Sequence, residues 1–213
     1  TEDVAGARFS TNPSNGDNWR FTFPDDAFDT ADVKAAYYRR PGRPEPMAGL
    51  QDAAQIYSVG EWQASLQSLY WALNGRWLNA PHLIALAENK VRQLMAARAL
   101  GLKVPDSWLT NDPETFHSVL RRGGTVGKTL RNALVQDESR GKVIFTTRLQ
   151  DGRELDPLSI QASPMLLQPE IAKRFDIRVT VVGEQVFAVS IDSQGQEETQ
   201  VDWRRTSRLD LPH

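Results

Sequence analysis

Residues 165–191 constrain the fold most, because a charged segment lies inside a stretch that otherwise has the composition of β-strands. The apolar run at 165–167 is followed by a dense group of charges and then by β-branched residues at 176–182. Gly183 and Glu184 come next, and a second apolar stretch follows them. Two strand-like runs joined by such a short turn are typical of a β-hairpin.

The charges at the start of this hairpin pose the main functional question of the sequence. In a strand the side chains alternate, so Asp176 and Arg178 share one face, while Ile177, Val179 and Val181 share the other. We therefore expect the apolar face to pack on a core. The polar face has two interpretations, a surface ion pair contributing about 0–1 kcal/mol or part of a binding site, and the alternation alone does not choose between them.

The composition excludes several classes of protein. The chain has 213 residues, long enough for one large domain or two modest ones, and its net charge of −2 lacks the basic excess of a nucleic-acid-binding surface. It has no cysteine and only three histidines, which argues against disulfides, thiol chemistry and a histidine metal site. No apolar run approaches a membrane helix, and the polar N-terminus is unlike a secretory signal. We expect a cytoplasmic protein that binds neither membranes nor nucleic acid.

The order of elements predicts a mixed α/β architecture. Up to about Pro105 the pattern favours helices, the clearest of which spans residues 58–75, with Ser58 and Glu61 at capping-box spacing. Another helix is expected to run to about residue 100, and strands dominate after Pro105.

Two lysines stand out against this background. Lys90 lies near the start of a helix, where a solvated helix face is the commoner explanation. Lys128 lies in a strand between Val126 and Leu130, which alternation places on the same face. A lysine among apolar neighbours either extends its ammonium group to solvent or meets an anion. The periodicity by itself does not bring the two lysines together.

Taken in order, four motifs resemble the ATP-grasp superfamily, and within it the ATP-grasp ribosomal-peptide maturases of the microviridin or graspetide type. They are "NAPHLIALAENKVRQLMAARALGLKVPDSWLTND", Lys128 in a strand, "LLQPEIAKRFDIRVTVVGEQVFAVSIDSQ" and "VDWRR". The resemblance extends from about Val33 onward. It implies an α/β (α+β) ATP-grasp fold with an N-terminal pre-ATP-grasp α/β domain, here incomplete. The implied segments are the pre-ATP-grasp domain (1–80), a connecting helix (81–105), the small central domain (106–175) and the beginning of the C-terminal lobe (176–213).

The resemblance also implies roles for individual residues. Lys90 and Lys128 match the lysines that approach the ATP phosphates, and Asp176 matches a position near the ribose. Residues 168–171 match the hinge between the sub-domains. Gln168 lies in this hinge, and backbone groups of Glu170 and Ile171 would bind the adenine edge. Arg178 and Arg204 match arginines that face the transferring phosphate or acyl phosphate. The polar loop 131–141 would cover the triphosphate.

The cofactors and partner implied in the same way are ATP, Mg²⁺ and a ribosomal precursor peptide with leader and core; a homodimer is left open. ATP would convert a peptide carboxylate to an acyl phosphate, and a hydroxyl or amine would then close an ester or amide ring. No metal ligand is assigned, because Asp192 and Asp202 lack the sequence context of the family's Mg²⁺ ligands, which we expect outside this chain. Two other functions remain open: a general carboxylate–amine ligase resembling glutamate ligases, and a non-catalytic module that binds nucleotide or peptide.

Overall fold

The computed structural model describes residues 6–16, 18–39, 41–45, 48–130, 134–137, 140–150 and 155–205; within these ranges the side chains of 134–137 and 140–142 are not described. Contacts along the chain divide it into two compact units, Thr1–Glu88 and Asn89–His213. The four finer segments expected from the sequence stay a prediction. No described helix combines the length and apolar composition that crossing a membrane would require.

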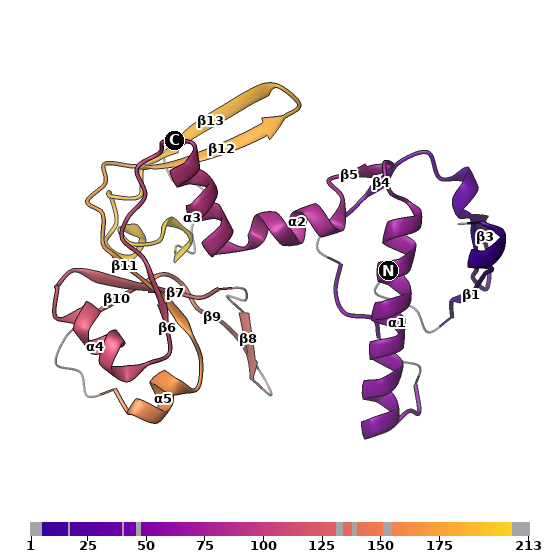
Figure 1. Ribbon diagram of the computed structural model, residues 1–213, viewed down its shortest axis with the longest axis horizontal. Coiled ribbons are helices and arrows are strands. Elements are labelled where there is room, and N and C mark those ends of the chain that lie inside the picture. The colour runs from indigo at the N-terminus through magenta and orange to yellow at the C-terminus, as the bar shows by residue number, and fades with distance from the viewer. Residues whose placement is uncertain are drawn as a thin grey trace. The chain divides into compact units, whose positions relative to one another are not determined.

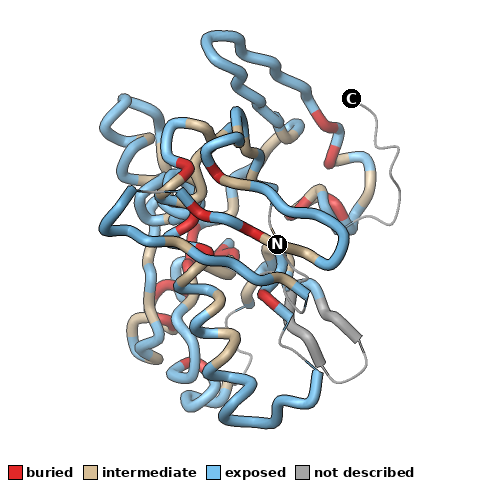
Figure 2. Tube along the Cα trace, turned by 90° about the vertical axis from the view of Figure 1, so that its right-hand side faces the viewer, coloured by how far each residue is buried: buried red, intermediate tan, exposed pale blue. Residues whose placement is uncertain are grey.

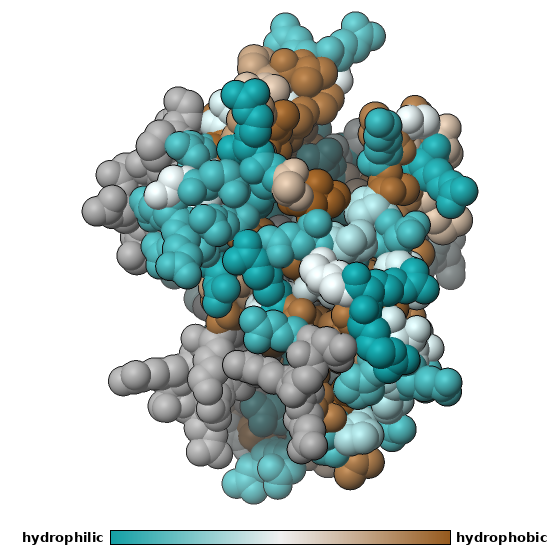
Figure 3. All heavy atoms as spheres, turned by 90° about the vertical axis from the view of Figure 1, so that its left-hand side faces the viewer, coloured by the Kyte–Doolittle hydropathy of each residue, from teal (hydrophilic) through white to brown (hydrophobic). Residues whose placement is uncertain are grey.

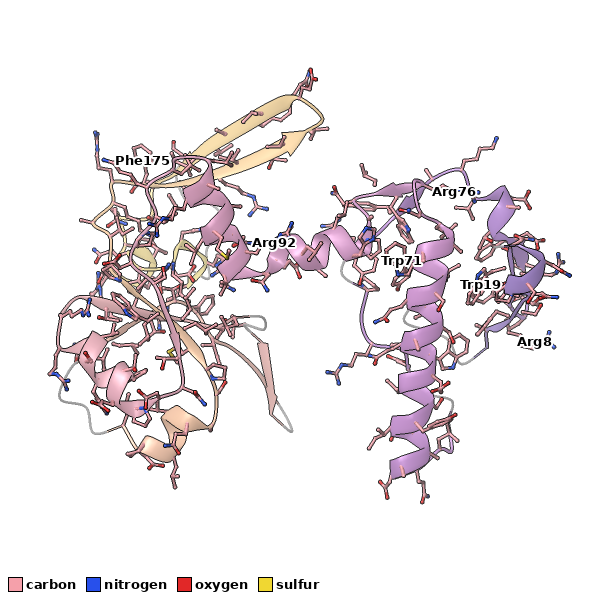
Figure 4. The ribbon with its side chains drawn as sticks, viewed as in Figure 1. Arg8, Trp19, Trp71, Arg76, Arg92 and Phe175 are labelled. Carbon is pink, nitrogen blue, oxygen red and sulfur yellow. The ribbon has the colours of Figure 1, made fainter. Side chains whose placement is uncertain are left out.

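The first unit packs one long helix against a small sheet. Trp19 lies between the two, and it joins Phe21 of the sheet and Leu66, Leu69 and Leu73 at the helix in a buried core (Figure 4). The elements are β1 (Arg8–Thr11), η1 (Pro13–Asn15), β2 (Trp19–Thr22), β3 (Ala27–Asp29), η2 (Thr30–Asp32), β4 (Ala36–Tyr37), α1 (Asp52–Ala72), β5 (Trp77–Leu78) and α2 (Pro81–Glu88). β1, β2 and β3 are antiparallel, whereas β4 and β5 form a short parallel pair.

Two helices differ from the sequence-based expectation. The long helix begins at Asp52, so Ser58 and Glu61 lie inside it and the predicted capping box is wrong. Propensity favours continuing the helix through the alanine-rich residues that precede Ser58. The single helix expected to run to about residue 100 is two helices, because Asn89 interrupts it. The Asn89 side chain accepts a 3.0 Å hydrogen bond from the backbone N–H of Arg92 and caps the second helix.

The second unit is built on a four-stranded sheet in the order β10-β7-β11-β6. Its elements are α3 (Lys90–Ala99), β6 (Trp108–Thr110), α4 (Pro113–Leu120), β7 (Thr125–Lys128), β8 (Leu134–Asp137), β9 (Arg140–Val143), β10 (Thr147–Leu149), α5 (Pro157–Gln161), β11 (Met165–Pro169), β12 (Asp176–Val182), β13 (Gln185–Ile191), η3 (Glu197–Thr199) and η4 (Trp203–Arg205). α4 and α5 cover one face of the sheet (Figure 1). The core on that face contains Phe116, Val119, Leu120, Ile160 and Leu167.

Gly127 allows close packing on this core face. A Cβ atom added to it would lie 2.7 Å from Sδ of Met165 and 3.0 Å from Cδ1 of Leu149. A larger residue would displace the ends of these two side chains, which pack against the core that α4 and α5 help to form. The sheet therefore stays in contact with α4 and α5 at the strand that carries Lys128.

The hairpin predicted at Gly183-Glu184 is confirmed, but the packing predicted for its apolar face is wrong. β12 pairs with β13 over its whole length, and in the described chain no other strand joins this two-stranded sheet. Ile177, Val179 and Val181 are 60%, 54% and 62% exposed. The tube of Figure 2 is pale blue along most of the hairpin, and Figure 3 shows hydrophobic atoms gathered where it projects. Alternation separates the two faces of a strand, but only a second layer can bury one of them.

The segment predicted as a polar loop, 131–141, has strand structure in its described part. β8 and β9 form an antiparallel hairpin, and residues 131–133 and 138–139 lie outside the described residues. Its suggested role as a cover for phosphates stays a prediction.

Candidate functional site

Strand alternation directs three side chains to the face of the sheet opposite α4 and α5. Leu167 in β11 points into the core, so its neighbour Gln168 points the other way. Val126 and Lys128 of β7 lie on the same face as Gln168, and Gln168 is the register partner of Val126. These three side chains line a cavity of about 690 Å³.

Most of the residues singled out from the sequence line this one cavity. Besides Lys128 and Gln168, five further candidates lie around it: Glu170, Ile171, Asp176, Arg178 and Arg204. They come from the residues just after β11, from the start of β12 and from η4, and η4 is distant in sequence from the other two. Lys90 is not among the lining residues. Its Nζ donates a 2.9 Å hydrogen bond to the carbonyl oxygen of Leu130, just beyond the strand that carries Lys128.

Lys128 is a half-buried cation near other cations. Burial lowers the pKa of its ammonium group, and the nearby positive charges of Lys90, Lys173 and Arg204 lower it further. The carboxylate of Asp202 acts in the opposite direction. Because the charged form of Lys128 is destabilised in the free protein, an anion bound in the cavity would be favoured at this position.

Asp176 and Arg178, the two charged residues at the start of the hairpin, do not pair with each other. Both carboxylate oxygens of Asp176 accept hydrogen bonds from Nζ of Lys173, at 3.0 and 2.8 Å, and this lysine also reaches the carbonyl oxygen of Val201. Within the part of the chain that the structure describes, the Arg178 side chain makes no hydrogen bond or ion pair, whereas its backbone pairs with Val189 of β13. The surface ion pair considered as an alternative is therefore absent, and Arg178 lies at the cavity with its donors available to a ligand.

Arg204 is held by a carboxylate that the sequence analysis set aside. Asp202 accepts hydrogen bonds from Nε and Nη2 of Arg204 at 2.8 and 2.6 Å. It also accepts bonds from the backbone N–H groups of Thr146 and Arg204. Burial by itself would raise the pKa of Asp202, but these hydrogen bonds and the charge of Arg204 outweigh it and hold the pKa at about 2. In the sequence, the i, i+2 spacing of Asp202 and Arg204 in "VDWRR" could have indicated this pair.

Side-chain contacts hold the predicted hinge in place and leave part of its backbone able to bind a ligand. Gln168 is buried, and its amide donates a 2.8 Å hydrogen bond to Oγ of Ser107. The carboxylate of Glu170 makes a bidentate ion pair with Arg148, and its backbone N–H donates to the carbonyl oxygen of Gly124. Of the Glu170 backbone, only the carbonyl group is left for an adenine edge.

The cavity carboxylates are poorly suited to hold a metal ion. Glu170, Asp176 and Asp202 each bind a basic side chain, respectively Arg148, Lys173 and Arg204. Across the described ranges no group of three or more His, Cys, Asp or Glu residues could hold a metal. The described residues therefore do not form a Mg²⁺ site.

A second cavity of about 990 Å³ adjoins the first and shares Val201 with it. Its lining contains two acidic residues, Glu197 and Glu198, and two basic residues, Arg148 and Arg205. Because Arg148 is already paired with Glu170, this larger cavity offers less uncompensated positive charge to a polyphosphate than the cavity around Lys128.

Comparison with solved structures identifies the fold as ATP-grasp. More specifically, the chain is similar to ligases and macrocyclases of this fold that are associated with ribosomal peptides. No protein-family model matches the sequence, and no curated protein matches it.

Three of these structures illustrate the likeness. A Chryseobacterium gregarium RiPP-associated ATP-grasp ligase, solved with ADP and a leader and core peptide, is 24% identical, with a TM-score of 0.78 over 94% of this chain and 61% of that chain. The macrocyclase MdnC from Microcystis aeruginosa MRC, bound with precursor peptide MdnA, is 26% identical (TM-score 0.74; 88% and 63%). The macrocyclase MdnB from the same organism is 26% identical (TM-score 0.71; 89% and 63%).

These structures confirm the resemblance seen in the sequence. The chain has the fold of ATP-grasp ribosomal-peptide maturases over the part that it covers. It spans 61–63% of the length of these three solved chains, so the ATP-grasp fold is incomplete here, as expected.

Proposed function

We propose that this chain is part of an ATP-dependent ligase that activates a side-chain carboxylate of a ribosomal precursor peptide and closes an ester or amide crosslink. One observation carries the proposal: Lys128, Arg178 and Arg204 line a single cavity together with the hinge residues. In this proposal ATP is the nucleotide and Mg²⁺ accompanies it. The fold shared with MdnC, which was solved with its precursor peptide, supports a peptide partner.

The cavity suits phosphoryl transfer because that reaction requires positioning and positive charge rather than a protein nucleophile. Lys128 would contact the phosphates, and Lys90 would hold the adjoining segment at Leu130 through its 2.9 Å bond. The Glu170 carbonyl and the Ile171 backbone would meet the adenine edge, and Asp176 would lie near the ribose. Arg178 and Arg204 would face the γ-phosphate and, after transfer, the acyl phosphate.

The proposed reaction requires only ATP and the peptide as reactants. A carboxylate oxygen of the peptide attacks the γ-phosphorus of ATP, and ADP leaves. A Ser or Thr hydroxyl or a Lys amine of the same peptide then attacks the acyl carbon. Phosphate leaves, the attacking group gives up its proton, and the ester or amide bond forms.

Nucleotide binding tests the proposal first. Titration calorimetry of the 213-residue chain with a non-hydrolysable ATP analogue should show binding that Arg178→Gln weakens, whereas Arg98→Gln, an exposed change at the end of α3, should not weaken it. Mass spectrometry of a precursor peptide incubated with the enzyme and ATP then identifies the chemistry. Loss of one water per ring supports crosslinking, whereas added residues indicate a general carboxylate–amine ligase. Peptide binding without nucleotide binding would indicate a non-catalytic module.

A further inference from the structure

Groups of the protein itself occupy the full hydrogen-bonding capacity of the Asp202 carboxylate. Its side chain is 4% exposed, and four N–H groups donate to its two oxygens: Nε, Nη2 and the backbone N–H of Arg204, and the backbone N–H of Thr146. Four donors are the number that an ionised carboxylate can accept. Asp202 therefore ties η4 to the segment that enters β10.

The guanidinium group that Asp202 holds is accessible on its other side. The Arg204 side chain is 56% exposed, and it lines the same cavity as Lys128. Arginine has five N–H donors in a planar group. Asp202 takes one from Nε and one from Nη2, so three remain for a ligand. A long, half-exposed arginine without such an anchor would sample many rotamers.

The charges around Asp202 are predominantly positive. Lys90 on α3, Lys128 on β7, Lys173 before β12 and Arg204 on η4 all act on this region, and Arg178 on β12 lines the cavity as well. The other two cavity carboxylates are bound elsewhere, Glu170 by Arg148 and Asp176 by Lys173. Asp202 is the carboxylate that offsets the burial of Lys128.

We infer that Asp202 is a positioning residue: it fixes the Arg204 guanidinium at the cavity and supplies the negative charge that keeps Lys128 charged beside Arg204 before an anionic ligand binds. The inference rests on the proposed nucleotide site. Asp202 touches neither nucleotide nor peptide in this scheme, and it acts through Arg204 and Lys128.

Asp202→Asn tests this, because the amide is isosteric but lacks the charge, and its NH₂ group would face N–H donors. In the full chain we expect the affinity for a non-hydrolysable ATP analogue to fall at least tenfold by calorimetry, while the circular dichroism spectrum stays that of the wild type. Asp32→Asn, an exposed change in the other unit, is the matched control and should leave affinity unchanged. Since Asp202→Asn could unfold the protein, Arg204→Lys gives a second test at an exposed side chain. It keeps the charge but loses the planar group, and the affinity for the ATP analogue should fall similarly.

A readout without nucleotide separates positioning from a purely structural role. Nuclear magnetic resonance titration of the Lys128 side chain should show its pKa falling in Asp202→Asn and unchanged in Asp32→Asn. A folded Asp202→Asn protein with wild-type affinity for the ATP analogue and an unchanged Lys128 titration would overturn the inference. A wild-type chain that fails to bind the ATP analogue would overturn the proposed function instead, and the Lys128 titration would still decide whether Asp202 controls the charge of the cavity.

Discussion

The Nζ atom of Lys90 lies 2.9 Å from the carbonyl oxygen of Leu130 and donates a hydrogen bond to it. This contact joins the first residue of α3 to the segment that follows Lys128 in β7, across 40 positions of sequence. The two lysines that the sequence could not relate are thus connected through the backbone. Their charges also interact, because Lys90 lowers the pKa of Lys128.

Replacing Lys128 with Met should separate binding from stability. Methionine removes a desolvated ammonium group but keeps a similar volume, so we expect ADP affinity to fall about 10- to 100-fold, as for a lost charge-assisted contact of roughly 1.5–3 kcal/mol. The urea midpoint of the free protein should stay equal or rise, because the buried charge is gone. Lys103→Met, at an exposed lysine, is the control for both measurements; an unchanged ADP affinity in Lys128→Met would contradict the assignment.

The affinity for ADP should weaken as the pH rises. Burial and neighbouring cations lower the pKa of Lys128 below its usual 10.5, so Lys128 loses its proton, and with it the phosphate contact, at a lower pH than an ordinary lysine. Calorimetric titrations between about pH 7 and pH 10 would measure this. In Lys128→Met the corresponding decrease should disappear; if it persists unchanged, another group controls the pH dependence.

Acid should remove the stabilisation that Asp202 provides. Its pKa is lowered from 3.8 to about 2 in the folded state, so its contribution of about 2 kcal/mol is present above the unfolded value and is lost as the pH falls through the folded value. Urea unfolding should show the advantage of the wild type over Asp202→Asn shrinking by about 1 kcal/mol between pH 6 and pH 3. A difference independent of pH would show that Asp202 is not ionised as described.

The core beneath the site should be sensitive to truncation at Leu167. This residue is fully buried against the helices on the face opposite the cavity. Leu167→Ala should lower the free energy of unfolding by about 2–5 kcal/mol. Leu158→Ala, at a side chain 71% exposed, should change it by less than about 0.5 kcal/mol. Equal effects in chemical denaturation would argue against the register of β11.

The projecting hairpin should tolerate polar substitution. Val179 is 54% exposed and has no second layer over it in the described chain. Val179→Thr keeps the β-branched shape, so the free energy of unfolding should change by less than about 0.5 kcal/mol. Destabilisation by more than about 1 kcal/mol would mean that this face is covered in solution.

Local pattern was enough to predict the hairpin turn at Gly183 and the strand that carries Lys128. These follow from backbone geometry, in which the side-chain period of a strand is two wherever the strand lies. The ordered motifs also indicated the ATP-grasp fold, which the solved structures confirm.

Tertiary structure alone decided the rest. The partner of Asp176 is Lys173 rather than Arg178, Asp202 holds Arg204, and the apolar face of β12 is exposed. These outcomes depend on which layers pack together and on how deeply each charge is buried. Sequence spacing determines where a side chain can point, whereas desolvation and neighbouring charges, which arise only after folding, determine its partner and its pKa.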